Sequence, residues 1–253
     1  MSAPRGMLIP EMSGRASSPV LVGRAEQMAA LEAAFVSVRQ GGPSAVLLGG
    51  EAGVGKSRLV SDFSRTAASA GARVLTGGCL ELGTDGLPFA PFTAVLRDLV
   101  HEMGADAVAS RLPGRSTRGL ARLLPELGEP DTGGDPAEAR ARLFEEVLRA
   151  LEHLTGHSPV VLVIEDAHWA DRSSRDLLTF LIGNQRSLSG LLIVVTYRSD
   201  ELHRTHPLRP LLARWCPAWS AAAARSAPPR RSGPARPAAD AADGCGATRR
   251  SGT

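Results

Sequence analysis

The chain is almost free of lysine. Lys56 is the only lysine among 253 residues, and every other basic side chain is an arginine. This arginine-for-lysine, alanine-rich composition indicates a GC-rich coding sequence. Under such a bias a single lysine marks a position that arginine cannot take, because lysine is a compact point charge on a thin stem whereas arginine is a broad planar fork.

Long apolar runs and metal-binding cysteine patterns are also missing. No apolar run reaches the roughly 18 residues that a membrane-spanning helix needs, and residues 1–18 contain no apolar segment typical of a secretory signal. The three cysteines lie far apart and have no metal-binding spacing. We therefore expect a reduced, cytoplasmic setting and no membrane partner.

The end of the chain lacks the residues that build a core. From Pro217 to Thr253 there is no Leu, Val, Ile, Phe or Met, and six arginines stand against two aspartates. Such a segment cannot bury enough apolar surface to offset the cost of ordering, so we expect residues 216–253 to be a disordered tail. The net charge of residues 217–253 is +4, and that of the whole chain is +3. Residues 1–216 therefore have a net charge of −1. The basic character therefore belongs to the tail, and we expect no specific DNA binding by this chain alone.

The apolar patterns of the remaining chain predict an α/β fold. Apolar residues at helical spacing predict helices, and short β-branched runs predict strands that are buried on both faces. The predicted helices are 23–40, 56–70, 91–103, 118–124, 136–151, 172–186 and 207–215, and the predicted strands are 45–48, 73–76, 160–164 and 191–197. This order, with a helical insert after the second strand, predicts a three-layer domain with a parallel sheet over residues 20–215. Residues 1–19 are predicted to be a disordered leader.

One loop matches a phosphate-binding pattern completely. The pattern G-x-x-x-x-G-K-[ST] is met, between a predicted strand and helix, by Gly50, Glu51, Ala52, Gly53, Val54, Gly55, Lys56 and Ser57. Its glycines let backbone N–H groups converge on phosphates, and the helix N-terminus adds a partial positive charge. In such a loop Lys56 reaches the β- and γ-phosphates and Ser57 ligates Mg²⁺. The alternative is a glycine-rich turn with a chance lysine, but the motif with its context predicts ATP and Mg²⁺ as cofactors.

Two carboxylates follow the buried strand 160–164. Glu165 and Asp166 come at its carboxyl end, where open α/β sheets bind their ligands. We expect Glu165 to hold Mg²⁺ through water and Asp166 to orient the attacking water. The order Glu-Asp inverts the commoner Asp-Glu, so an exchange of these roles stays open. The alternative for both acids is N-capping of the next helix.

Two further side chains lie near this edge of the predicted sheet. Arg198 follows the strand 191–197, so it emerges beside the phosphates and is placed to sense the γ-phosphate. A surface salt bridge is the alternative. His168 follows the acidic pair closely, and its sequence context fits a partner of that pair as well as it fits plain packing.

Several motifs together resemble one family. They are Leu-Val-Gly-Arg at 21–24, the phosphate-binding loop at 50–57 (the P-loop), Glu-Asp-Ala-His-Trp-Ala-Asp at 165–171, Thr-Tyr-Arg at 196–198, and the segments 87–92 and 206–211. This set resembles the ATPase module of large LuxR-type, MalT-like transcriptional regulators, which are signal-transduction (STAND) NTPases related to AAA+ proteins. The resemblance covers about residues 20–214. It implies that Val22 and Arg24 contact the adenine side and that Arg198 is the sensor of the γ-phosphate.

The resemblance also implies segments that this sequence lacks. A final strand, a winged-helix domain, helical sensor repeats and a helix-turn-helix are expected after residue 215, where the composition turns to Ala, Arg and Pro. We therefore expect a truncated chain or an out-of-frame tail. The implied sheet order places the missing strand beside strand 45–48. We accordingly expect an unpaired edge there, with poor solubility or self-association.

Three functions agree with these observations. The leading expectation is an ATP-binding, slowly hydrolysing switch module of a LuxR-type regulator, with ATP and ADP as its ligands. The second is an ordinary AAA+-like ATPase acting on protein or DNA, which needs a sensor arginine from a second domain that this chain lacks. The third is a non-functional fragment. A small-molecule P-loop kinase is disfavoured, because no arginine-rich lid follows strand 160–164.

Overall fold

The computed structural model describes residues 6–12, 24–42, 44–81, 87–111, 117–130 and 135–215. The strands are β1 (Gly6–Met12), β2 (Ser44–Gly50), β3 (Arg73–Gly78), β4 (Val160–Glu165) and β5 (Leu191–Arg198). The α-helices are α1 (Ala25–Arg39), α2 (Lys56–Ser69), α3 (Ala90–Met103), α4 (Ala105–Arg111), α5 (Pro136–Thr155), α6 (Arg172–Gly183) and α7 (Arg209–Trp215). Short 3₁₀ helices are η2 (Leu120–Arg122), η3 (Pro125–Leu127) and η4 (Ala167–Trp169).

The strands form one parallel sheet in the order β1-β2-β5-β4-β3. The register aligns the strand ends that matter for a ligand: Gly50 of β2 lies opposite Arg198 of β5, and Gly78 of β3 lies opposite Glu165 of β4. Because all strands run the same way, their carboxyl ends meet at a single edge. The loops that follow β2, β4 and β5 therefore converge there.

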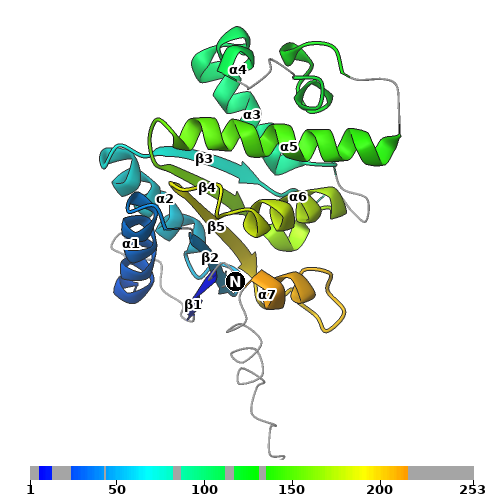
Figure 1. Cartoon of the computed structure of the whole chain (residues 1–253). Coiled ribbons are helices and arrows are strands. Elements are labelled where there is room, and N and C mark those ends of the chain that lie inside the picture. The colour runs from blue at the N-terminus through cyan, green and yellow to red at the C-terminus, as the bar shows by residue number, and fades with distance from the viewer. Residues whose placement is uncertain are drawn as a thin grey trace, which may run out of the picture.

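The sheet is covered by helices on both faces, as predicted (Figure 1). Strand residues alternate between two apolar cores, because successive side chains point to opposite faces. In β2, Val46 and Leu48 pack with α1 and α2, whereas Ala45 and Leu47 belong to the core with α3, α5 and α6. This alternation confirms the three-layer α/β fold and explains why β2, β4 and β5 read as unbroken apolar runs.

Most predicted elements are present within a few residues of their predicted bounds. The helical insert between β3 and β4 is also present, and it contains α4, which the sequence did not predict. The predicted helix 118–124 is instead the 3₁₀ turn η2, and α6 ends at Gly183 rather than near 186. Among the described residues, no helix has the length and apolarity that crossing a bilayer requires. The predicted tail, 216–253, lies outside the described residues.

The structure corrects two predictions at the edge of the sheet. Residues of the predicted disordered leader form β1, which pairs in parallel with β2 from Gly6 opposite Ala45 to Met12 opposite Gly50. The prediction of an unpaired edge at 45–48 is therefore wrong. Pro10 and a register shift between Ile9 and Met12 interrupt β1. Proline and bulges are features of edge strands, which explains why a run this short and broken gave little strand signal.

Candidate functional site

The loop between β2 and α2 has the backbone of an anion cradle. Gly53 (φ 73°) and Gly55 (φ 90°) adopt left-handed conformations that strain any other residue. Helix α2 begins at Lys56 without a side-chain cap and without an acidic residue in its first turn. Its first N–H groups are therefore available to an anion, with the positive end of the helix dipole behind them. This arrangement fits a phosphate group.

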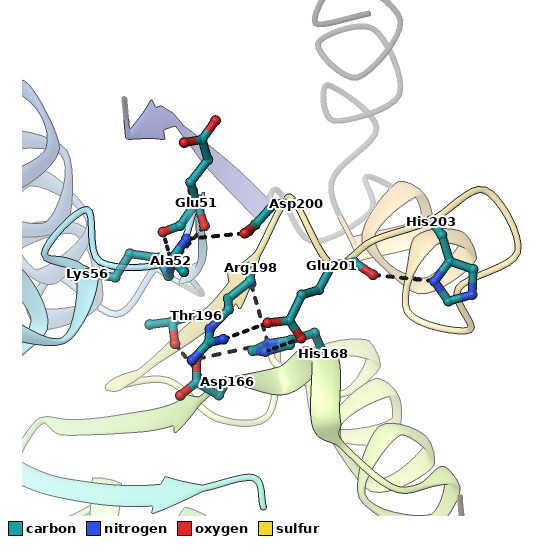
Figure 2. Close-up of polar contacts among 11 residues, drawn as sticks. Glu51, Ala52, Lys56, Asp166, His168, Thr196, Arg198, Asp200, Glu201 and His203 are labelled. Carbon is teal, nitrogen blue, oxygen red and sulfur yellow. Dashed lines mark hydrogen bonds and ion pairs between the residues drawn. The ribbon is translucent and has the colours of Figure 1, made fainter. Parts of the chain in front are cut away.

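Lys56 is buried within this loop. Its Nζ donates to the carbonyl oxygen of Gly50 at 2.7 Å and to that of Glu51 at 2.8 Å (Figure 2). Burial lowers the pKa of Lys56, and the carboxylates of Asp166 and Asp200 oppose that shift. The two loop carbonyls thus hold the ammonium of the only lysine of the chain within the cradle, and the charges of Asp166 and Asp200 favour the protonated form.

Ser57 and Glu165 meet across the site. Burial, followed by the charge of Asp166, raises the pKa of Glu165, and a hydrogen bond with the Ser57 side chain opposes that rise. The two oxygen-bearing side chains expected to serve Mg²⁺ are therefore in contact. Among the described residues, no group of three or more His, Cys, Asp or Glu is placed to hold a metal. Mg²⁺ is commonly bound by one or two carboxylates together with substrate phosphates.

Asp166 has an unusual backbone that is fixed by a neighbouring strand. Its φ of 52° is left-handed, which is uncommon for a residue other than glycine. Its N–H donates to the Thr196 hydroxyl at 3.0 Å. The Asp166 side chain makes no capping hydrogen bond, and Asp171 instead caps α6 by accepting from the Ser174 N–H at 3.0 Å. The N-cap alternative for Asp166 is therefore not what the structure shows.

Arg198 ends β5 on this edge, as predicted, and it lies in a network of polar contacts. Its Nη1 donates to Glu201 Oε1 at 2.6 Å, and its guanidinium lies 4.7 Å from the centre of the Trp169 ring. Its N–H donates to His168 Nδ1 at 3.4 Å, and His168 Nε2 lies 3.3 Å from Glu201 Oε2. The ion pair that was the alternative for Arg198 is thus present. His168 is buried, and its Nδ1 also lies 4.0 Å from Asp166 Oδ1 (Figure 2).

Arg24 lies beside the P-loop, where its guanidinium donates to the carbonyl oxygen of Val54. Val22, the other residue predicted for the adenine side, lies outside the described residues. The structure also adds residues that the sequence did not single out. Asp200 Oδ2 accepts from the Ala52 N–H at 3.5 Å, and Glu201 holds Arg198. The one signal in the sequence was their position two and three residues after Arg198.

Sequence comparison decides the family. A family model described as AAA ATPase domain matches residues 20–195. The chain belongs to this AAA ATPase domain family. Members of the family typically use ATP and Mg²⁺, and the geometry of this AAA ATPase module fits both.

The AAA ATPase module is similar to part of a longer protein. It is 28% identical over 220 residues to an uncharacterized protein of Rhizobium meliloti (strain 1021), a match that covers 78% of this chain and 20% of that protein. The chain therefore spans about a fifth of the length of this curated relative.

Two solved structures are similar at low identity. The structure of Drosophila ORC bound to DNA has 15% identity and a TM-score of 0.33, and the match covers 72% of this chain and 81% of that one. The structure of Drosophila ORC bound to GC-rich DNA and Cdc6 has 16% identity and a TM-score of 0.33, and that match covers 77% and 57%. Scores of this size do not relate the two folds in detail.

Proposed function

We propose that this AAA ATPase module binds ATP with Mg²⁺, hydrolyses it slowly and acts as the nucleotide switch of a LuxR-type transcriptional regulator. The observation that carries the proposal is the meeting of three segments at one sheet edge. Gly50, which opens the P-loop, lies opposite Arg198, and Ser57 of the same loop contacts Glu165 at the end of β4. The groups to which we assign phosphate binding, metal binding and sensing therefore lie at one edge of the sheet.

Each side chain has a role that follows from its chemistry. The N–H groups of the cradle and Lys56 bind the phosphates, and Ser57 and Glu165 hold Mg²⁺, which neutralises phosphate charge when it is bound. Asp166 accepts a hydrogen bond from the attacking water and orients it, so that ATP and water yield ADP and phosphate. The contact between Ser57 and Glu165 supports giving the metal to Glu165 and the water to Asp166, the roles first expected.

The regulatory part of the proposal rests on sequence. The motifs at 21–24, 165–171 and 196–198 resemble those of LuxR-type ATPase modules. The Rhizobium meliloti relative, which this chain matches over a fifth of its length, is long enough to carry further domains. A switch acting on such domains needs a segment whose state depends on the γ-phosphate, and we assign this role to the segment of Arg198.

Amide hydrogen exchange of the full chain tests the switch. MgADP and an Mg-bound non-hydrolysable ATP analogue are each expected to protect residues 50–57, because both ligands carry a β-phosphate. Only the analogue is expected to change exchange at 198–201, because only it carries a γ-phosphate. Amide exchange in helix α5, which covers one face of the sheet, is the internal reference. Protection by neither ligand contradicts ATP binding, whereas identical protection by both contradicts a switch and favours a stand-alone ATPase.

A further inference from the structure

The segment after β5 presents two acidic side chains to the candidate nucleotide site. Asp200 accepts from the P-loop N–H of Ala52 at 3.5 Å, and Glu201 accepts from Arg198 Nη1 at 2.6 Å (Figure 2). In a P-loop protein these are the groups expected to meet phosphate oxygens. Each carboxylate therefore occupies a donor that a nucleotide phosphate also requires.

Glu201 has two close neighbours, and Arg198 is the one that donates a hydrogen bond to it. One carboxylate oxygen accepts from Arg198, and the other lies 3.3 Å from His168 Nε2. His168 Nδ1 accepts from the Arg198 N–H, so the ring proton of a neutral His168 lies on Nε2. Within the described residues Nε2 makes no hydrogen bond, although it lies close to Glu201. With 1% of its side chain exposed, His168 is a fixed support rather than a mobile surface group.

The geometry creates a competition for Arg198. Its guanidinium lies against Glu201 on one side and over the Trp169 ring on another. A γ-phosphate that approaches the Glu201 side of the guanidinium must displace or share that carboxylate at Nη1, since both are anions and accept from the same N–H group. ADP has no γ-phosphate and leaves the pair of Arg198 and Glu201 undisturbed.

We propose that Glu201 is a positioning residue that sets the preference of this site for ATP over ADP by holding Arg198. The proposal rests on the proposed function, because it assumes that Arg198 serves the γ-phosphate. Glu201 raises the cost of engaging Arg198, so the module changes state only when the γ-phosphate outcompetes it. The ratio of ATP affinity to ADP affinity is therefore lower in the parent chain than in a variant that lacks the Glu201 charge.

Calorimetry with Mg-bound AMP-PNP and with MgADP tests this role. Glu201→Gln keeps the size of the side chain and one acceptor oxygen, but it removes the charge and replaces the other oxygen with an amide donor. We expect AMP-PNP to bind on the order of fivefold more tightly, as for a partly exposed ion pair, with ADP affinity unchanged. The matched control is Glu145→Gln on the exposed face of α5, where neither affinity should change.

A double-mutant cycle separates this role from a general charge effect. In an Arg198→Gln background, Glu201→Gln is expected to leave the ratio of the two affinities unchanged, because the residue through which it acts is gone. An equal gain for both nucleotides, a gain that persists in that background, or a loss of AMP-PNP affinity would each overturn the inference while leaving the proposed function standing. A parent chain that binds neither nucleotide overturns both, and unchanged ADP binding by Glu201→Gln shows that the variant is folded.

Discussion

The backbone N–H of Asp166 donates to the side-chain hydroxyl of Thr196 at 3.0 Å. This hydrogen bond joins the turn after β4 to the end of β5, and it holds Asp166 in its left-handed conformation. Thr196 itself is 3% exposed. The position of the acidic pair therefore depends on a hydroxyl of the neighbouring strand as well as on β4.

Thr196→Val should loosen this turn. Valine preserves the shape of threonine but leaves the Asp166 N–H without its acceptor, which we expect to lower the free energy of unfolding by about 1–3 kcal/mol. Urea denaturation measures the loss. Thr66→Val, an exposed position on α2, is the control and should cost less than about 0.5 kcal/mol. Equal losses in both variants would show that the hydrogen bond does not support the turn.

Asp166→Asn should separate hydrolysis from binding. Asparagine tolerates the left-handed backbone as well as aspartate does, so the turn is kept while the negative charge is lost. We expect ATP affinity to stay within about twofold and turnover to fall about a hundredfold, because orienting water matters only in the transition state. Turnover is measured by phosphate release, with Asp98→Asn on the exposed side of α3 as the control. Parental turnover in Asp166→Asn would contradict the role.

The sequence contained most of the fold and the core of the site. The P-loop is spelled by consecutive residues, and the strands β2, β4 and β5 are unbroken apolar runs, so both could be predicted from local pattern. Parallel strands then require their carboxyl ends to share an edge, so the sequence alone predicts that Glu165, Asp166 and Arg198 lie together.

What could not be predicted depends on distant pairing and on side-chain direction. Strand β1 owes its existence to β2, more than 30 residues further along the chain, as the register of Gly6 opposite Ala45 shows. The contact between Asp200 and the Ala52 N–H spans 148 positions. The pairing of Arg198 with Glu201 is local in sequence, but only a side-chain conformation decides whether the two groups meet.

The pairing of β1 can be tested by shortening the chain. Removal of residues 1–12 should expose the edge of β2, lower the free energy of unfolding by about 1–3 kcal/mol and speed amide exchange at 44–50. Exchange in β4, which does not pair with β1 or β2, should not change. Removal of residues 1–5 alone is the control. Unchanged exchange at 44–50 after the longer deletion would show that β1 does not protect this edge.

Cys79 should resist alkylation in the folded chain. Burial, reinforced by the charges of Asp171 and Asp166, raises its pKa to about 12, so at pH 8 the thiol is protonated and unreactive. We expect iodoacetamide to modify Cys79 about a thousandfold more slowly in the folded chain than in urea, as followed by peptide mass spectrometry. Rates should rise as the pH is raised toward that pKa. Equal rates with and without urea would contradict the burial of this thiol.

The central claim is that the cradle around Lys56 binds the phosphates of ATP. Isothermal titration of MgATP into the parent chain and into Lys56→Ala tests it most directly, with Arg58→Ala on the exposed first turn of α2 as the matched loss of one positive charge. The account predicts at least about a hundredfold weaker binding for Lys56→Ala, since a charge-assisted contact to two phosphates is lost, and a much smaller change for Arg58→Ala. Binding by Lys56→Ala at the affinity of the parent would contradict the account.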